Sequence, residues 1–201
     1  MKRYITLSLI CLLFSSGMLA QDINLPAPQT EGGLPLMQAL SKRQTIRAFA
    51  AKELDTQTLS NLLWAANGFN RSDKRTAPTA MNRQELEIYV VLSTGAYWHD
   101  AKNNVLVQKS TEDLRALTGR QDFVATTPVN IVIVADTEKQ AAKEYQYIDA
   151  GYISQNIYLF CASEGLATVV RGYVDRDALA KAMGLPDKQT IIVAQTVGFP
   201  Q

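Results

Sequence analysis

The chain has 201 residues, of which 47% are hydrophobic, and its formal net charge at pH 7 is +1. This balance lacks the excess of basic residues that binding to nucleic acid or to an anionic membrane surface requires. The sequence contains one histidine, His99, and two cysteines, Cys11 and Cys161, which argues against a zinc site and against a Ser-His-Asp or Cys-His mechanism. We expect His99 to be exposed without a role and Cys161 to pack as a small apolar residue. We therefore expect no metal site and no catalytic side chain, so that chemistry would depend on a bound cofactor.

Residues 1–20 have the features of a secretory signal peptide. Lys2 and Arg3 precede an apolar run over 5–14, and small residues lead to a cleavage point after Ala20. The apolar run is shorter than the ~20 residues that a membrane-spanning helix needs. A buried helix and a retained membrane anchor are the alternatives. We predict a protein exported to the bacterial periplasm, with no membrane span after processing.

A single domain is predicted for residues 21–201. Residues 21–33 are expected to form an extended arm, and residues 70–75 a polar loop. Apolar spacing and capping residues predict helices over 34–40, 55–67, 110–119, 138–164 and 175–184. Apolar runs predict strands over 86–92, 129–135, 167–170 and 191–197, and a hairpin over 97–107 that turns at 100–104. Because helices and strands are intermixed, we predict the α+β class, with a mixed, mainly antiparallel sheet flanked by helices.

The most informative stretch is Ser41–Phe49, in which Arg43, Thr45 and Arg47 are spaced two residues apart. Successive side chains of an extended chain alternate between two faces, so these three point the same way. Two guanidinium groups and a hydroxyl on one face can bind a phosphate monoester, which carries about −1.5 to −2 charges at pH 7. The alternative interpretation is a solvated basic strand, because lysine and arginine side chains are usually exposed.

Three later stretches complete the set of candidate segments. Small residues and a proline fill the run Thr76–Gln84 before a strand, and an ordinary loop is the alternative there. The helix at 138–164 carries apolar residues on more than one face between Ile148 and Phe160, so we expect it to be widely buried. The last candidate is the turn Arg171-Gly172, which follows a predicted strand.

Taken in order, these four stretches resemble the nitroreductase-like flavoproteins, and the resemblance covers nearly all of the mature chain. The first is similar to the family pattern Arg-x-Ser/Thr-x-Arg/Lys-x-Phe, which implies that Arg43, Thr45 and Arg47 hold the phosphate of FMN. The compact length and the Arg75–Ala80 segment look closest to short nitroreductases related to the azoline-oxidising enzymes of peptide modification. Many relatives complete the phosphate site with a basic residue in a C-terminal extension. That residue is missing here, which makes Arg75 a further phosphate candidate.

The second stretch is similar to the family segment Pro-Ser-x-x-Asn-x-Gln-Pro. This implies that Thr79, Asn82 and Gln84 contact the flavin or its ribityl chain. The side chain of asparagine both donates and accepts hydrogen bonds, which suits a ring edge that carries both kinds of group. Glu85 stands where the family often has proline, and is a departure from the pattern.

The remaining two stretches resemble the family's turn at the flavin ring and its long central helix. In relatives, the turn that matches Arg171-Gly172 donates a backbone N–H to the reactive ring nitrogen. Many relatives have Glu-Gly or Gly-Gly there, and we predict that the Arg171 side chain lies near the flavin and favours anionic substrates. The helix at 138–164 looks like the central helix of the family's dimer, which implies a homodimer with two flavin sites at its interface.

The resemblance implies an exported FMN-dependent oxidoreductase. The flavin would pass hydride or electrons from NAD(P)H or another reductant to an electron-poor small molecule, such as a nitroaromatic or a quinone. The alternatives are a flavin-dependent oxidase or dehydrogenase of an organic substrate, a non-catalytic FMN-binding module, and an exported structural domain without a ligand. Export favours a donor from the membrane or periplasm, or the organic substrate itself, over NAD(P)H.

Overall fold

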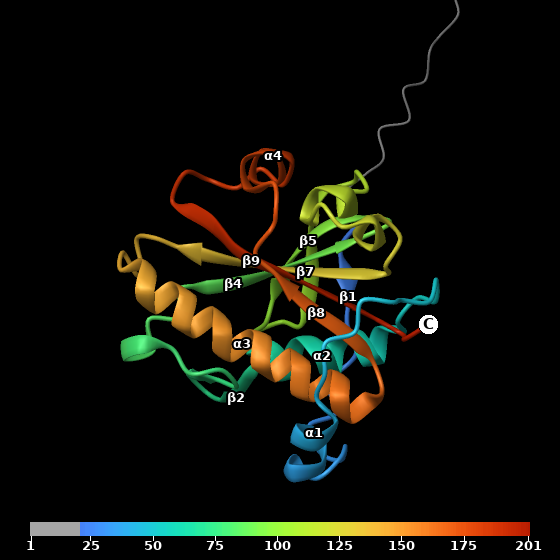
Figure 1. The fold of residues 1–201 in the computed structure, drawn as a ribbon. Coiled ribbons are helices and arrows are strands. Elements are labelled where there is room, and N and C mark those ends of the chain that lie inside the picture. The colour runs from blue at the N-terminus through green and yellow to red at the C-terminus, as the bar shows by residue number, and fades with distance from the viewer. Residues whose placement is uncertain (1–20) are drawn as a thin grey trace, which may run out of the picture.

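The computed structural model describes residues 21–201, so the signal peptide expected at residues 1–20 lies outside the described residues. Its centre is a seven-stranded sheet of order β1-β6-β5-β4-β7-β9-β8, in which each neighbouring pair is antiparallel (Figure 1). The strands of this sheet are β1 (Ile23–Asn24), β4 (Leu86–Leu92), β5 (Gly95–Asp100), β6 (Val105–Ser110), β7 (Val129–Asp136), β8 (Ala167–Arg171) and β9 (Gln189–Gly198). A separate hairpin pairs β2 (Phe69–Arg71) with β3 (Lys74–Arg75).

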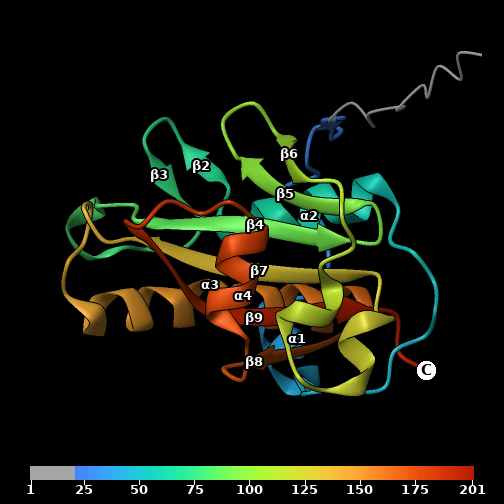
Figure 2. The same ribbon diagram turned by 90° about the horizontal axis from the view of Figure 1, so that it is seen from above.

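Helices cover both faces of the large sheet, which confirms the α+β class. The helices are α1 (Leu36–Lys42), α2 (Thr56–Asn67), α3 (Lys143–Glu164) and α4 (Arg176–Ala182). Helices α2 and α3 pack on one face and α4 packs on the other, while α1 lies against α3 (Figure 2). Three 3-10 turns, η1 (Ala80–Asn82), η2 (Arg115–Thr118) and η3 (Asp122–Ala125), lie in the connecting segments.

Strand β7 separates two apolar layers. All eight of its residues are buried. Ile131 and Ile133 pack in the layer under α2 and α3, whereas Val132 and Val134 pack in the layer under α4. Alternate side chains of a strand point to opposite faces, so a continuous apolar run fills both layers. The prediction of a buried central strand over 129–135 is confirmed.

The helices begin and end at capping residues that the sequence indicates. Asp55 accepts a hydrogen bond from the backbone N–H of Thr58 at 2.8 Å and begins α2. Asp175 accepts one from the N–H of Ala178 at 3.3 Å and begins α4. Helix α3 ends at Gly165, whose φ of 69° lies in the left-handed region that glycine adopts without strain. Side-chain caps of this kind each stabilise a helix by about 1 kcal/mol.

Several local predictions are wrong. The helix expected over 110–119 is replaced by the end of β6 and the short η2 turn. The side chains of Ser110 and Asp113 accept hydrogen bonds from N–H groups only two residues later, and such bonds close tight turns instead of capping a helix. The loop expected over 70–75 contains the β2–β3 hairpin, and α3 begins at Lys143 instead of Glu138.

The prediction of burial is confirmed for Cys161, and the prediction of exposure is wrong for His99. Cys161 is buried on α3, as expected. His99, which we expected to be exposed, is buried as well. It lies on the same face of β5 as Tyr97, because alternate residues share a face, and Tyr97 belongs to the layer under α2 and α3.

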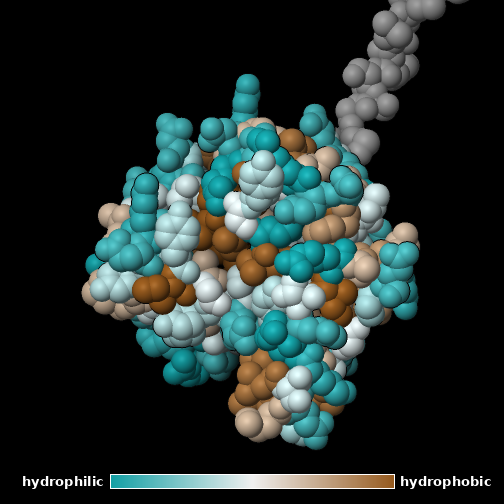
Figure 3. Space-filling view, in the orientation of Figure 1, coloured by the Kyte–Doolittle hydropathy of each residue, from teal (hydrophilic) through white to brown (hydrophobic). Residues whose placement is uncertain are grey.

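One face of α3 is left uncovered by the described chain. Ile153 and Ile157 are buried against the sheet, but Ile148 and Tyr152 are 49% and 44% exposed, so the wide burial expected for this helix is not found within the single chain. Apolar side chains gather over α1 and over the first turns of α3 (Figure 3). The large exposed hydrophobic residues of these two helices are Leu36, Met37, Leu40, Tyr145, Tyr147, Ile148 and Tyr152.

Candidate functional site

The basic segment after α1 runs beside the edge strand β8. The backbone N–H of Ile46 donates to the carbonyl of Thr168 at 3.1 Å, and Phe49 forms an isolated bridge with Pro200. These contacts hold the segment extended while the Arg47 side chain stays exposed. Within residues 21–201, neither arginine of the segment forms an ion pair. The segment therefore presents guanidinium groups whose charge is available to an anion.

Tyr158 organises this segment, and the sequence analysis overlooked it. Its phenol oxygen lies 3.0 Å from the hydroxyl of Thr45 and accepts a hydrogen bond from the backbone N–H of Val170 at 3.2 Å. The guanidinium carbon of Arg43 lies 5.3 Å from the centre of the Tyr158 ring, within the range of a cation–π contact. One buried side chain of α3 thus ties the basic segment to β8. A tyrosine among helical apolar residues gave no signal of this role.

A groove of about 730 Å³ opens beside the basic segment. Arg43 and Ile46 line it from one side, and Tyr158 and Leu166 line it from the α3 side. Its volume is within the 300–1,000 Å³ that is typical of sites for organic ligands. A ligand with an anionic end at the basic segment has room here.

The turn after β8 corrects the prediction for Arg171. Its side chain is buried instead of facing a ligand, and its guanidinium donates to the carbonyl of Thr118 at 2.6 Å, to Asn130 Oδ1 at 2.9 Å and to Thr196 Oγ1 at 2.6 Å. Burial lowers the pKa of Arg171 to about 10, so it stays charged at pH 7. Arg171 is thus a structural cation that joins β8 to β7, β9 and η2. Gly172 is exposed, and the backbone contact expected of this turn stays a prediction.

The segment around η1 forms a compact structure of its own. Thr79 Oγ1 accepts a hydrogen bond from the N–H of Gln84 at 3.1 Å, and Gln84 Nε2 donates to Asn82 Oδ1 at 3.1 Å. Met81, Asn82 and Gln84 have φ values of 53°, 53° and 49°, in the region that disfavours residues other than glycine. The N–H of Ala80 donates to Asp149 on α3 at 2.9 Å and fixes the segment to that helix. The structure therefore brings Thr79, Asn82 and Gln84 together.

Two buried carboxyl groups lie beneath the η1 segment. Glu85 is fully buried, and neither of its side-chain oxygens has a hydrogen-bond partner within residues 21–201. Burial, together with the neighbouring carboxyl of Asp149, raises the pKa of Glu85 to about 7, while Lys139 acts in the opposite direction. The departure from proline at this position thus places a titratable acid beside the α3 residue that anchors η1.

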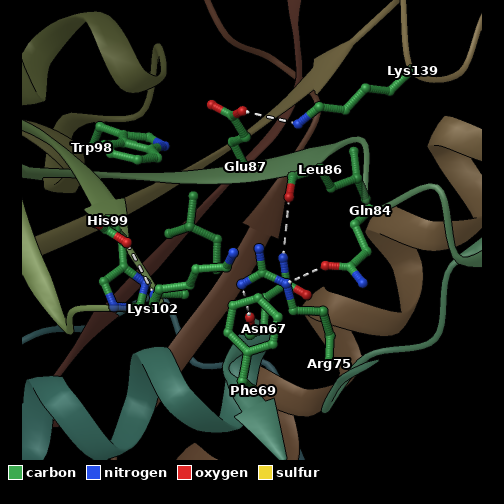
Figure 4. Close-up of a pocket in the computed structure, with 13 residues that line it drawn as sticks. Asn67, Phe69, Arg75, Gln84, Leu86, Glu87, Trp98, His99, Lys102 and Lys139 are labelled. Atoms are coloured by element: carbon green, nitrogen blue, oxygen red, sulfur yellow. Dashed lines mark hydrogen bonds and ion pairs between the residues drawn. The ribbon is translucent and has the colours of Figure 1, made fainter. Parts of the chain in front are cut away.

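The candidate residues form two groups along α3 instead of one site. Arg43 and Thr45 gather at Tyr158, whereas the η1 segment is anchored at Asp149. Tyr158 follows Asp149 by nine residues, which corresponds to about 13 Å along a helix axis. Arg75, the further phosphate candidate, belongs with neither arginine of the basic segment, because it lies in another cavity with Gln84 (Figure 4). A single chain therefore does not bring the predicted residues into one cavity.

A comparison with protein families identifies the family of this chain. Residues 40–199 match the model of the Nitroreductase family. The chain belongs to the nitroreductase family. It is accordingly an oxidoreductase, and the resemblance and the fold expected from the sequence are both confirmed.

Individual relatives agree with the family assignment. A crystal structure of a protein from Ralstonia eutropha JMP134, provisionally named a nitroreductase, is 38% identical, covers 92% of each chain and superposes with a TM-score of 0.85. A protein from Methanocaldococcus jannaschii, also provisionally named a nitroreductase, is 29% identical over 158 residues, in a match that covers 69% of this chain and 79% of that protein. A third, from Desulfovibrio desulfuricans, was crystallised in complex with FMN. At 21% identity, with a TM-score of 0.64 over 84% of this chain and 88% of that chain, it shows the shared fold alone.

Two kinds of feature are absent from residues 21–201. No group of three or more histidine, cysteine, aspartate or glutamate side chains is placed to hold a metal ion. In the same part of the chain, no helix has the length and hydrophobicity to cross a bilayer.

Proposed function

We propose that this nitroreductase-family protein is an exported, FMN-dependent oxidoreductase that passes hydride or electrons to an electron-poor small molecule. The observation that carries the proposal is the pair Arg43 and Arg47, whose charges no carboxylate neutralises within the described residues, with Thr45 and Arg43 both held at Tyr158. A phosphate monoester fits this donor set, because two guanidinium groups and a hydroxyl supply charge-assisted hydrogen bonds to its oxygens. The groove that Arg43 and Tyr158 line also has the size of a site for an organic ligand such as FMN.

Each group of this chain has a separate task in the proposed site. Arg43 and Arg47 bind the phosphate, and Tyr158 positions Thr45 by its hydrogen bond. The backbone of the Arg171-Gly172 turn offers its N–H to the ring, and the buried guanidinium of Arg171 holds that turn on the sheet. Bound FMN would supply the two-electron chemistry. No side-chain acid or base is required of this chain.

We propose a homodimer in which each flavin contacts both subunits. The separation of the basic segment from the η1 segment along α3 supports this, because two copies related by a twofold axis could bring one segment of each together. The exposed Ile148 and Tyr152 on α3 also support it, together with the exposed apolar residues of α1. Covering these side chains would give the large apolar interface of an obligate dimer, which buries more than about 2,000 Å².

The partners of the reaction follow from chemistry and from the expected export. The acceptor is a small electron-poor molecule such as a nitroaromatic or a quinone. The donor is a membrane or periplasmic reductant or the organic substrate itself, although NAD(P)H would also reduce the flavin in vitro. A flavin-dependent oxidase or dehydrogenase remains the alternative enzyme, and an FMN-binding module remains the non-catalytic alternative.

The absorbance spectrum of the purified protein tests the proposal. We expect flavin absorbance that bleaches on addition of a reductant and returns on addition of a quinone or a nitroaromatic. Bleaching by an organic substrate and return with oxygen alone would favour the oxidase. A bound flavin that no donor reduces would indicate a binding module, and a colourless protein that takes up no added FMN would overturn the proposal.

The expected export is tested separately, by fractionating the native host and sequencing the N-terminus. Folded, FMN-loaded protein found in the cytoplasm with residues 1–20 still attached would contradict both the periplasmic location and the argument about the donor.

A further inference from the structure

A second cavity, of about 230 Å³, lies where strands β4 and β5 separate. Their paired register runs from Leu92↔Gly95 to Tyr89↔Trp98 and ends there, while β5 continues to pair with β6 as far as Asp100. The first three residues of β4 therefore have no partner on β5, and the sheet forks. The end of α2 and the β2–β3 hairpin line the opening, as Figure 4 shows.

Three basic side chains, Arg75, Lys102 and Lys139, line this cavity from different elements. Arg75 of β3 lies with its guanidinium carbon 3.9 Å from the centre of the Phe69 ring. Its Nε donates to Gln84 Oε1 at 3.0 Å and its Nη1 donates to the carbonyl of Asn67 at 3.0 Å. These contacts fix the guanidinium and leave Nη2 without a hydrogen-bond partner in the described chain. Lys102, from the turn between β5 and β6, extends towards Arg75 from the other side (Figure 4).

The nearby carboxylates are engaged elsewhere. Glu87 pairs with Lys139 at 3.4 Å and accepts a hydrogen bond from Gln189 at 3.0 Å. Asp100 accepts hydrogen bonds from the backbone of its own turn, including one from the N–H of Lys102 at 3.0 Å. Within residues 21–201, neither Arg75 nor Lys102 has an ion-pair partner.

The neutral part of the cavity wall indicates the kind of anion that fits. Burial lowers the pKa of His99 to about 4, so this side chain adds no charge at pH 7. Phe69, Leu86 and Ile88 supply apolar surface. The volume is below the ~300–1,000 Å³ of sites for drug-sized ligands, which indicates a small occupant with an apolar body.

We propose that this cavity binds a small organic carboxylate. Its oxygens accept hydrogen bonds from Arg75 Nη2 and Lys102 Nζ, and its apolar body packs against Phe69, Leu86 and Ile88. A carboxylate satisfies two converging cations by charge-assisted hydrogen bonds, and a neutral ligand would leave both uncompensated. This site shares no phosphate-binding residue with the proposed flavin site, although Gln84, a predicted flavin contact, also lines this cavity and accepts a hydrogen bond from Arg75.

Binding of benzoate by the mature protein as purified tests the inference. His99 is the only histidine of the chain and lines this cavity as well as an adjoining one, so the imidazole signals of protein labelled with ¹⁵N-histidine report on this region of the molecule. We expect benzoate to shift these signals saturably. Benzamide has a similar shape without the charge, and we expect its affinity to be lower by a factor of at least roughly ten. Benzoate that perturbs a flavin spectrum but leaves the His99 signals unmoved would overturn the proposal.

Substitutions identify the side chains that bind the carboxylate. Lys102 is exposed on a turn, so Lys102→Gln leaves the fold intact, and we expect it to weaken benzoate binding about tenfold. Lys74→Gln is the matched control, because Lys74 precedes Arg75 on β3, does not line the cavity and pairs with Asp73. We expect the control to bind benzoate as the wild type does. Equal benzoate affinity in wild type and Lys102→Gln would contradict the site.

Discussion

Two positions on α3, Tyr158 in its C-terminal half and Asp149 in its N-terminal half, hold their candidate residues in opposite ways. We call the surroundings of Tyr158 the first end and those of Asp149 the second end. At Tyr158 the basic segment is extended and partly exposed, and it has charges that no other described residue neutralises. At Asp149 the η1 segment is closed on itself by hydrogen bonds, with three residues in the left-handed region and a buried carboxyl pair beneath it. The first end has guanidinium groups that can still bind an anion. In the second end, several polar side chains already form hydrogen bonds within the segment. The first end is therefore suited to supply affinity, and the second to supply a preformed surface.

The largest expected effect comes from removing the charges of the first end. Arg43→Ala combined with Arg47→Ala removes two charge-assisted contacts, each worth about 1.5–3 kcal/mol, so the Kd for FMN should rise roughly 10²–10⁴-fold. Titration of the stripped protein with FMN measures this. Lys52→Ala is the control, since Lys52 is an exposed cation soon after the same segment and does not line the groove. A folded double variant that binds FMN as tightly as the wild type would rule out the phosphate assignment.

The next prediction tests whether a dimer unites the two ends. Ile148→Glu combined with Tyr152→Glu would bury several carboxylates in the proposed interface, and should raise the dimer dissociation constant by about 10²-fold or more. FMN should be lost together with the dimer. Sedimentation at micromolar concentration measures the association, and Lys181→Glu on α4 is the control for a charge reversal on the other face of the sheet. A wild-type protein that sediments as an FMN-loaded monomer would refute the shared site.

A third prediction concerns the carboxyl pair at the second end. The pKa of Glu85 is raised to about 7 in the folded protein from 4.5, so the folded state binds more protons than the unfolded state between these values. The contribution of Glu85 to the free energy of unfolding therefore falls by about 3 kcal/mol as the pH rises from 4.5 to 7. Above pH 7 this contribution stays constant. Glu85→Gln should remove this loss.

Urea unfolding of wild type and Glu85→Gln at several pH values measures that difference. The wild type must be compared with the variant at each pH, because His99 also makes stability depend on pH. Its pKa is lowered to about 4, so its contribution to stability rises with pH over part of the same range. The exposed Glu112→Gln is the control and should follow the wild type. Parallel stability curves for wild type and Glu85→Gln would mean that Glu85 is ionised at no cost in the folded state.

Local patterns predicted the framework well, and long-range neighbours decided the rest. Strand β7 and the caps Asp55 and Asp175 follow from residues next to one another, and they are confirmed. The Arg171 side chain turns inward because its acceptors come from β7, β9 and η2, which are distant in sequence. Likewise, a list of motifs contains no distances, so the sequence could not show that the candidate residues divide between two ends of one helix.

The smallest expected effect is at Tyr158, because this side chain positions Thr45 and contributes no charge to phosphate binding. Tyr158→Phe keeps the ring under Arg43 but removes the hydroxyl that contacts Thr45 and accepts from the N–H of Val170. A net hydrogen bond is worth about 1 kcal/mol, so we expect roughly fivefold weaker FMN binding and a loss of stability of similar size. Tyr147→Phe is the control, because Tyr147 is exposed on the same helix and the described chain gives its hydroxyl no partner. If Tyr158→Phe binds FMN like the wild type while Arg43→Ala does not, the arginines alone hold the phosphate, and the hydroxyl of Thr45 needs no positioning.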